Sequence, residues 1–286
     1  MPSILVIGAT GNVAGHVARQ LSDAGIPVRA MARNPQTAQL PPQLEVVRGD
    51  LTIPESLDPC LNGIDAVFLV WTAPPATIAP TLDRVLSRVR RIVFLSAPLK
   101  TPHPLFQQPN PVRRIAEEIE RRIESSGAQW TFLRPGMFAS NALEWWAHQI
   151  RAGDTVRWPY LSVPTAPIDP RDIAAVGVRA LCEDGHAGAE YLLTGPQSLT
   201  HLEQIETIGR VLSRKLRVEE IPPADAPNEL AQLIGFPPAI AKLLLDAWAA
   251  AAGHPAFMSS KFAEITGTAP RTFQTWAADH AALFGG

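Results

Sequence analysis

The chain has 286 residues, with 25 basic and 27 acidic side chains and a formal net charge of -2. This balance excludes the basic surface that nucleic acids or anionic membranes require, and no apolar run approaches the roughly 18 residues of a membrane span. The two cysteines, Cys60 and Cys182, cannot form a disulfide framework and have no metal-ligand spacing. We therefore expect a cytoplasmic protein without a targeting segment or metal, built as one α/β domain or a domain with a smaller lobe, and present as a monomer or homodimer.

A strand, a glycine-rich turn and a helix are predicted at the amino terminus, where residues 3–15 read SILVIGATGNVAG. The apolar run is typical of a buried parallel strand, and residues 12–24 have the pattern of a helix. Gly8 would permit a tight turn, and Gly11 would let the backbone approach a pyrophosphate bound at the helix N-terminus. The third small residue of this dinucleotide-binding motif would be Ala14. Glycine turns also end strands for purely structural reasons, so the neighbouring elements decide between the two interpretations.

The second predicted strand, residues 26–32, supplies the required context and ends at Arg33. In dinucleotide-binding folds a carboxylate at this place binds the ribose 2'-hydroxyl of NAD, whereas an arginine favours the 2'-phosphate of NADP. No carboxylate occurs between Asp23 and Glu45. Arg33 therefore predicts NADPH/NADP as the cofactor, although a solvent-facing arginine at a strand end would look the same in sequence. Arg29 could make a second phosphate contact or belong to a polar strand face.

Strands and helices continue to alternate up to about residue 140, which predicts an α/β fold with a Rossmann-type, doubly wound parallel sheet. Ligands of such sheets bind outside the carboxyl ends of the strands, so the segments that follow the strands should meet at one crevice. The predicted strands after residue 33 are 44–48, 66–70, 91–96 and 130–134, and the predicted helices are 54–61, 79–89 and 111–126.

Beyond residue 140 the alternation weakens and the chain becomes mostly helical in pattern. We predict a dinucleotide-binding domain over residues 1–152 and a smaller, mostly helical C-terminal lobe over residues 153–286 that covers the substrate. Segments near 166–195 should return to the main sheet, because an apolar helix at 173–181 is followed by a strand candidate at 191–195. Further helices are predicted at 238–252 and 273–284.

Residues 98–111, PLKTPHPLFQQPNP, contain five prolines, against an ordinary usage of about 5%. We predict neither a helix nor a central strand here, because proline lacks the N–H group that both require. The segment could be a lid over the crevice or a rigid surface connection.

Several segments carry a family likeness: GATGNVAG at 8–15, VRAMARNP at 28–35, GDL at 49–51, IVFLSA at 92–97 and SGAQWTFLRPGMFASN at 126–141. Together they resemble the NmrA-like branch of the atypical short-chain dehydrogenase/reductase superfamily. The closing EITGTAPRTFQTWAADH also resembles the tail of actinobacterial members, so the likeness extends over essentially the whole chain. It implies the fold and the nucleotide, whereas the reaction stays open. The family includes quinone and enone reductases, ether reductases of plant phenolics, and regulators that bind NADP without turnover.

The resemblance implies a role for residues at each strand end. Arg33 would bind the 2'-phosphate, and Asp50 and Leu51 would lie along the adenine, although Asp50 could also be an ordinary turn residue. Trp71 and Thr72 would flank the middle of the cofactor. The other implied contacts are Gly8, Thr10, Gly11, Asn12 and Val13 on the pyrophosphate, and Pro135, Gly136, Met137 and Phe138 beside the nicotinamide.

The proton donor that the resemblance implies, a Tyr with a Lys four positions later, is absent from this sequence. The chain has two tyrosines, Tyr160 and Tyr191, and neither is followed by Lys at that spacing. Ser96 matches the serine that the superfamily has after the fifth strand, but an unactivated hydroxyl is a poor acid and could instead cap a turn. His103 is the best remaining side chain that titrates near neutrality, although lone loop histidines are usually solvated. Ser96 and His103 are therefore the catalytic candidates.

The helix after residue 140 should line the crevice, and we expect Asn141, Trp145 and Trp146 to contribute to a substrate pocket. Aromatic side chains there would suit a flat apolar acceptor, although such residues also pack in protein cores by default. Arg113 could anchor an anionic substrate or the cofactor, or belong to a solvated helix face with spaced opposite charges.

These features predict an NADPH-dependent reductase that transfers hydride to an apolar conjugated acceptor, such as a quinone, enone, imine or polyketide-like compound, without the usual Tyr and Lys pair. The cofactor carries the chemistry and the protein supplies orientation. The alternative is a non-catalytic NADP(H)-sensing regulatory protein, which the missing pair favours. An aromatic-lined crevice favours the enzyme, because a sensor needs a partner surface rather than a second pocket.

Overall fold

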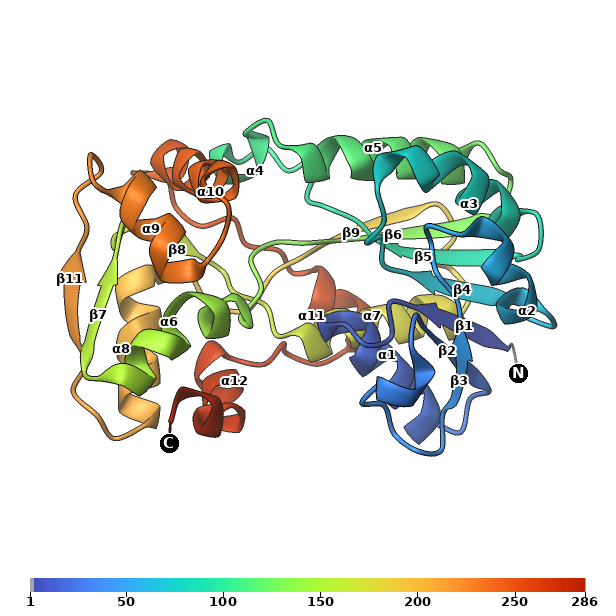
Figure 1. Cartoon of the computed structure of the whole chain (residues 1–286), viewed down its shortest axis with the longest axis horizontal. Coiled ribbons are helices and arrows are strands. Elements are labelled where there is room, and N and C mark those ends of the chain that lie inside the picture. Colours follow the sequence, from blue (N-terminus) through green and yellow to red (C-terminus); the bar gives the residue numbers. More distant parts are fainter. Residues whose placement is uncertain (1–2, 286) are drawn as a thin grey trace.

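Seven parallel strands form the main sheet in the computed structural model, which describes residues 3–285 (Figure 1). The strands are β1 (Ile4–Ile7), β2 (Val28–Ala32), β3 (Glu45–Arg48), β4 (Ala66–Leu69), β5 (Arg91–Leu95), β6 (Gln129–Pro135) and β9 (Ala189–Leu193). Their order across the sheet is β3-β2-β1-β4-β5-β6-β9, so the chain winds outward in both directions from β1 and β4. The predicted Rossmann-type sheet is confirmed.

Helices cover both faces of this sheet because its strands are apolar on both faces. Consecutive side chains of β1 point to opposite faces, so Ile4 and Val6 pack in one core and Leu5 and Ile7 pack in the other. All four side chains are fully buried. The first helical layer consists of α1 (Asn12–Asp23) and α7 (Pro170–Cys182), and the second of α2 (Asp58–Leu61), α3 (Ile78–Leu86) and α5 (Pro111–Glu124) (Figure 1).

The proline-rich segment contains a short helix, α4 (Pro104–Gln107), so the prediction of no helix in residues 98–111 is wrong. Pro104 occupies the first position of this helix, where a missing N–H is tolerated because no helical carbonyl could accept it. The His103 imidazole caps the same turn, since its Nδ1 accepts a hydrogen bond from the Leu105 N–H at 3.2 Å. Proline therefore starts this helix instead of preventing it.

The remaining elements form a second, mostly helical group with its own apolar core (Figure 1). Four tryptophans, Trp145, Trp146, Trp158 and Trp248, surround the buried imidazole of His201, and the ring centroids lie between 5.0 and 6.3 Å from it. The elements of this group are α6 (Asn141–Ala152), β7 (Thr155–Trp158), β8 (Pro164–Thr165), β10 (Leu199–Thr200), α8 (His201–Val211), β11 (Arg217–Glu220), α9 (Ala226–Ile234), α10 (Pro238–Ala251) and α12 (Phe273–Asp279).

The chain passes between the two groups more than once. Helix α7 packs against α1, and β9 pairs with β6. Both elements therefore belong to the domain built on the main sheet, although they follow α6 in sequence. A later helix, α11 (Lys261–Thr266), packs back on α7 and β9, and α12 then packs on α8. Short 3-10 helices complete the structure: η1 (Pro35–Thr37), η2 (Pro54–Leu57), η3 (Pro75–Thr77) and η4 (Ala281–Phe284).

Two small sheets brace the second group: β7 pairs with β11 in parallel, and β8 pairs with β10 in antiparallel orientation. The sequence pattern does not predict these strands, because each has only two to four residues. Within the described part of the chain, no single helix is long and apolar enough to cross a membrane. Helices α9 and α10 reach that length and hydropathy only as a pair, and the pair is bent by 118°.

Candidate cofactor and substrate site

The turn between β1 and α1 has the geometry that a phosphate site requires. Gly8 has a φ of 85°, which favours glycine, and a Cβ there would lie 3.1 Å from the Val70 Cβ. Gly11 donates its N–H to the Gly8 carbonyl at 2.8 Å and directly precedes α1. The first N–H groups of α1 have no helical carbonyl to bind, and its N-cap position provides no side chain for them. An anion such as a pyrophosphate can therefore bind at this helix start.

A cavity of about 190 Å³ lies beside this turn, at the carboxyl ends of β1, β2, β3 and β4. Predicted cofactor residues from four separate strand ends line it, namely Gly8, Thr10, Gly11, Arg33, Asp50, Leu51 and Thr72. The other lining residues are Ile7, Met31, Ala32, Gly49, Thr52, Val70 and Ala73. The strand ends thus come together as the sheet topology predicts.

Arg33 carries an exposed positive charge in the lining of this cavity. Within residues 3–285, no carboxylate lies within 4.0 Å of its guanidinium. Arg29, by contrast, donates to the Glu45 carboxylate at 2.8 Å and to the Cys60 carbonyl at 2.9 Å. Of these two arginines, Arg33 is the one with a charge available for a phosphate.

The Asp50 carboxylate accepts hydrogen bonds from the N–H and the hydroxyl of Thr52, both at 2.8 Å. The backbone hydrogen bond has the larger effect in holding the pKa of Asp50 below its ordinary value, and the positive charge of Arg33 acts in the same direction. Asp50 is therefore ionised at neutral pH. It shapes its own turn and also lines the cavity, and its contact with the adenine stays a prediction.

Three of the contacts predicted for the pyrophosphate and the middle of the cofactor lie outside the lining of this cavity. The Asn12 amide donates to the Ser140 hydroxyl at 2.5 Å and links the glycine turn to the segment after β6. Val13 is buried in the core beneath α1. The Trp71 indole N–H donates to the Ala73 carbonyl at 2.7 Å, which fixes the loop after β4.

The segment that is predicted to lie beside the nicotinamide begins at Pro135, the last residue of β6, and is held by backbone hydrogen bonds. Gly136 donates its N–H to the last carbonyl of β9 at 2.9 Å. Ile168 donates its N–H to the Met137 carbonyl at 2.9 Å, and Phe138 forms a parallel bridge with the same residue. This wall of the site therefore depends on segments more than thirty residues further along the chain.

Ser96 belongs to a chain of charged groups that runs from the interior to the surface. Its hydroxyl donates to Glu120 at 2.6 Å, and Glu120 accepts two hydrogen bonds from Arg134 at 2.6 and 3.0 Å. Arg134 also donates to Glu190 at 2.5 Å, and Glu190 pairs with Lys100 at 2.6 Å. Because the Ser96 proton is directed at a carboxylate, it is not available to a substrate. The hydroxyl oxygen can still accept a hydrogen bond.

Both ring nitrogens of His103 are occupied by backbone groups. Since Nδ1 accepts the Leu105 N–H, the neutral ring carries its proton on Nε2, which lies 2.8 Å from the Pro255 carbonyl. The side chain is 7% exposed. His103 therefore ties the proline-rich segment to residue 255 and has no nitrogen left for proton transfer.

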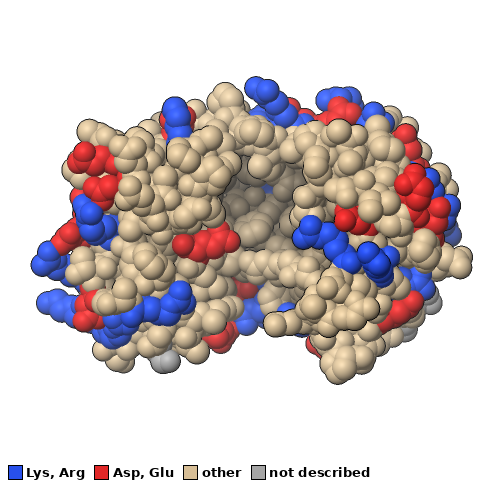
Figure 2. All heavy atoms as spheres, in the orientation of Figure 1, with Lys and Arg blue, Asp and Glu red and all other residues tan. Residues whose placement is uncertain are grey.

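A second cavity, of about 310 Å³, lies beside Gly136 and Met137 and is walled largely by apolar side chains. Figure 2 shows that the molecule is hollowed between the sheet and the second group of elements. The polar side chains in the lining are Asn110 and Arg113, at the start of α5. An acceptor in this cavity would lie against the predicted nicotinamide wall. The other lining residues are Ala97, Pro98, Leu99, Leu105, Phe106, Val112, Ile240, Leu243, Leu244, Ala247 and Trp248.

The aromatic residues predicted for the substrate pocket lie in the core of the second group instead of in either cavity wall. Trp145 and Trp146 are 5% and 0% exposed, and neither lines the two cavities. The member of the tryptophan cluster that reaches the second cavity is Trp248. Asn141 begins α6 and donates its N–H to the Phe138 carbonyl at 3.2 Å.

The two tyrosines also lie away from the lining of both cavities. Tyr160 packs at the edge of the core of the second group. Tyr191 lies on β9, its hydroxyl is 2.7 Å from Nδ1 of His186, and burial raises the pKa of this phenol.

Sequence reasoning did not find the contribution of α10 to the second cavity. The helix was predicted, but an apolar stripe indicates only that a helix packs against something, not against what. Gly15, the residue after the motif, also lies close to the turn, since a Cβ there would lie 3.0 Å from the Ala9 carbonyl oxygen. Ala14, the third small residue predicted from the spacing, is buried in the core beside β1. The α10 residues in the cavity wall are Ile240, Leu243, Leu244, Ala247 and Trp248.

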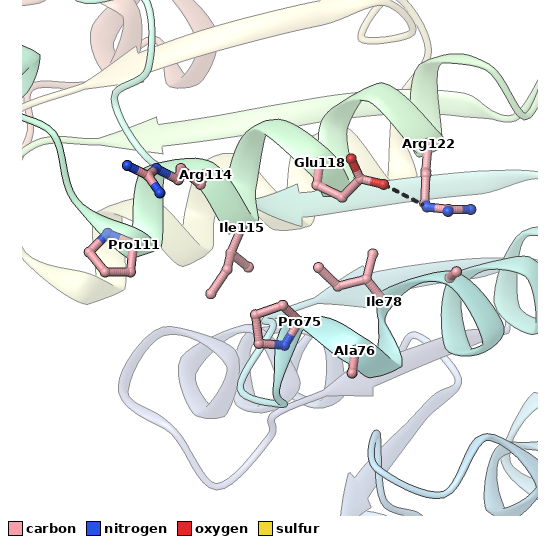
Figure 3. A pocket seen from close by; sticks show the side chains of 9 residues that line it. Pro75, Ala76, Ile78, Pro111, Arg114, Ile115, Glu118 and Arg122 are labelled. Carbon is pink, nitrogen blue, oxygen red and sulfur yellow. Dashed lines mark hydrogen bonds and ion pairs between the residues drawn. The ribbon is translucent and has the colours of Figure 1, made fainter.

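A groove of about 460 Å³ lies on the outer side of the sheet domain, between α3 and α5 (Figure 3). Ile115 points across it toward Pro75 and Ile78. Its lining contains three charged residues, of which Glu118 and Arg122 pair with each other at 2.9 Å and the third is Arg114. The groove is larger than either cavity, but it lacks the glycine turn and the segment after β6. The predicted cofactor residues that line a cavity therefore lie at the two cavities described above and not at this groove.

Comparison with known proteins identifies the family and the cofactor class. A family profile described as NAD(P)H-binding matches residues 8–184. Triphenylmethane reductase from Citrobacter sp. has the same fold, with a TM-score of 0.81 and 20% identity over 98% of this chain and 99% of that chain. An NADPH-dependent quinone oxidoreductase from Escherichia coli, in complex with NADPH, has a TM-score of 0.78 and 23% identity over 99% and 100% of the two chains.

Two relatives are similar in sequence over their whole length. One is (4-alkanoyl-5-oxo-2,5-dihydrofuran-3-yl)methyl phosphate reductase from Streptomyces griseus, with 39% identity over 98% of this chain and 99% of the relative. The other is NAD(P)H azoreductase from Xenophilus azovorans, with 30% identity over 99% of both chains. The chain therefore belongs to the NAD(P)H-binding family that this profile describes, as its resemblance to NmrA-like short-chain dehydrogenases/reductases implied, and two reductases are among its relatives.

Proposed function

We propose that this protein is an NADPH-dependent reductase that adds hydride to a C=C bond conjugated with carbonyl groups, in an acceptor of the alkanoyl-butenolide class. The observation that carries the proposal is the apolar cavity of about 310 Å³ beside Gly136 and Met137. Ligand pockets of this size with few polar groups suit small apolar molecules. The relative with 39% identity, named for a butenolide phosphate, supports this class of acceptor.

Reduction of such an acceptor does not require a strong acid from the protein. In a 4-alkanoyl-5-oxo-2,5-dihydrofuran, the ring double bond is conjugated with both the ring carbonyl and the acyl carbonyl. Addition of hydride gives an enolate whose charge is delocalised over two oxygens, so a strong protein acid is not needed and water can supply the proton. A reductase of this acceptor can therefore work without a tyrosine that has a lysine four positions later, and with the Ser96 proton donated to Glu120.

The bound NADPH would supply the hydride, and the protein would supply orientation. The glycine turn and the start of α1 would bind the pyrophosphate, and Arg33 would bind the 2'-phosphate. Gly136 and Met137, fixed by β9 and Ile168, would support the nicotinamide against the cavity. The apolar walls from α4 and α10 would exclude water around the acceptor. Ser96 lines neither cavity and directs its proton at Glu120, so it has no part in proton transfer in this scheme.

The test is NADPH oxidation by the purified protein with an alkanoyl-butenolide, a benzoquinone and an azo dye as separate acceptors. We expect turnover of the butenolide to exceed that of the other two. Turnover of the quinone or dye alone would show that the acceptor class is wrong. Tight NADPH binding without turnover of any acceptor would favour the alternative function, a non-catalytic NADP(H) sensor, which the missing Tyr and Lys pair also permits.

A further inference from the structure

The lining of the second cavity contains one charged side chain and one further polar side chain among apolar residues. Arg113 comes from the first turn of α5, and the neighbouring polar residue in the lining is Asn110. The opposite wall is the apolar stripe of α10. A cavity with this division suits a ligand that has an apolar chain at one end and a negative charge at the other.

Two hydrogen bonds fix the guanidinium of Arg113 and leave other N–H groups of the side chain unpaired. Its Nε donates to Glu117 at 3.0 Å and its Nη1 donates to the Phe106 carbonyl at 3.0 Å. Arginine has five N–H donors, so three remain, and within residues 3–285 no protein acceptor takes them. The Asn110 oxygen accepts the Arg113 backbone N–H at 2.8 Å, which leaves the Asn110 amide nitrogen as a further donor.

Several features argue against an ordinary surface arginine. The Arg113 side chain is 24% exposed, and both of its protein partners fix its position beside the cavity. Glu117, which balances part of the charge, does not line the cavity. Arg114, the next residue, lines the outer groove instead and serves as a natural comparison.

We propose that Arg113, assisted by the Asn110 amide, binds a phosphate monoester carried by the acceptor, while the acyl chain of the acceptor lies along α10. This inference rests on the proposed function, since it specifies the substrate of the same site. A planar guanidinium with paired N–H groups matches the oxygens of a phosphate. The arrangement fixes the acceptor at both ends, with its ring between the Arg113 end and the nicotinamide wall.

The experiment compares two ligands on the protein saturated with NADP⁺, which blocks turnover and occupies the cofactor phosphate sites. The ligands are an alkanoyl-butenolide with a hydroxymethyl group and its phosphate monoester, and their Kd values are measured by titration calorimetry. We expect the wild-type protein to bind the phosphate monoester about 10- to 100-fold more tightly than the alcohol, the range of one charge-assisted contact. Arg113→Gln should bring this ratio close to one, Arg113→Lys should retain part of it, and Arg114→Gln should retain all of it.

Equal binding of the two ligands by the wild-type protein, failure of both to bind, or an unchanged ratio in Arg113→Gln would overturn the phosphate site. Turnover with NADPH is scored separately. A phosphate preference that depends on Arg113 but comes without NADPH oxidation would leave the phosphate site standing and refute the reductase. Reduction of both compounds without a preference would do the reverse. Circular dichroism of each variant checks that the fold is retained.

Discussion

Replacing Arg33 by alanine tests the cofactor assignment most directly. Arg33 lines the cavity of about 190 Å³ at the carboxyl ends of β1 to β4, where we propose that the cofactor binds. It forms no ion pair within the described residues, so its charge is available for a 2'-phosphate. A charge-assisted hydrogen bond contributes about 1.5 to 3 kcal/mol, and the exposure of Arg33 to solvent favours the lower end. We therefore expect Arg33→Ala to raise the Kd of NADPH about tenfold. The Kd of NADH, which lacks the 2'-phosphate, should change little.

The assay is fluorescence titration of both nucleotides at fixed ionic strength. The preference of the wild-type protein for NADPH should shrink as salt is raised, because an exposed charge pair is screened. Arg121→Ala is the matched control, since this arginine is 68% exposed on α5 and lines neither cavity. An equal loss of NADPH and NADH binding in Arg33→Ala would refute the assignment of the 2'-phosphate to this residue.

Three further predictions concern the turn, the cavity wall and the buried histidine. Gly8→Ala should lower the thermal unfolding midpoint and weaken NADPH binding. The left-handed backbone conformation costs about 1 to 2 kcal/mol for alanine, and the new Cβ would approach Val70. An unchanged midpoint would contradict this. Leu244→Ala should raise the KM of a long-chain acceptor severalfold with little effect on the Kd of NADPH. Trp145→Ala should instead destabilise the fold by about 3 to 5 kcal/mol in urea unfolding, and the reverse pattern would return Trp145 to the substrate pocket. Burial lowers the pKa of His201 from 6.5 to about 4, so the unfolded chain takes up this proton first. The stability that the neutral ring provides is present above about pH 6.5 and should be lost toward pH 4, by up to about 3 kcal/mol. Urea unfolding at each pH measures this loss, and His201→Phe should reduce it.

The main sheet and the cofactor cavity follow from local patterns in the sequence. Each strand of the sheet is a short apolar run, and the topology of parallel sheets then brings the strand ends to one edge. The rule that strand ends meet at one edge predicts that Gly8, Arg33, Asp50 and Thr72 lie around one cavity, although they are spread over sixty-five positions of the sequence. The identity of each residue could be assessed separately, because a glycine turn and a lone arginine have local chemical meanings.

The second cavity depends on contacts between distant segments, which no local pattern contains. Trp145 and Trp146 are apolar at helical positions, and periodicity cannot tell a cavity wall from a core. His103 looks like a free loop histidine until its Nε2 is found against the Pro255 carbonyl, 152 residues away. The helix α4 was missed because five prolines outweighed a local signal, the Pro104 at its first position.

The repeated passage of the chain between the sheet and the second group has a consequence for ligand exchange. Domains joined by a single connection can open about it as a hinge. Here β6 leads out to α6, and α7 and β9 lead back to the sheet. The chain leaves again, returns with α11, which packs on α7 and β9, and then leaves a last time with α12 and η4, which pack on α8 and α6. Several covalent connections in parallel would all have to bend together for the two groups to separate. We therefore expect the nucleotide to enter and leave through local movement of loops at the strand ends, with the two groups fixed relative to each other throughout the catalytic cycle.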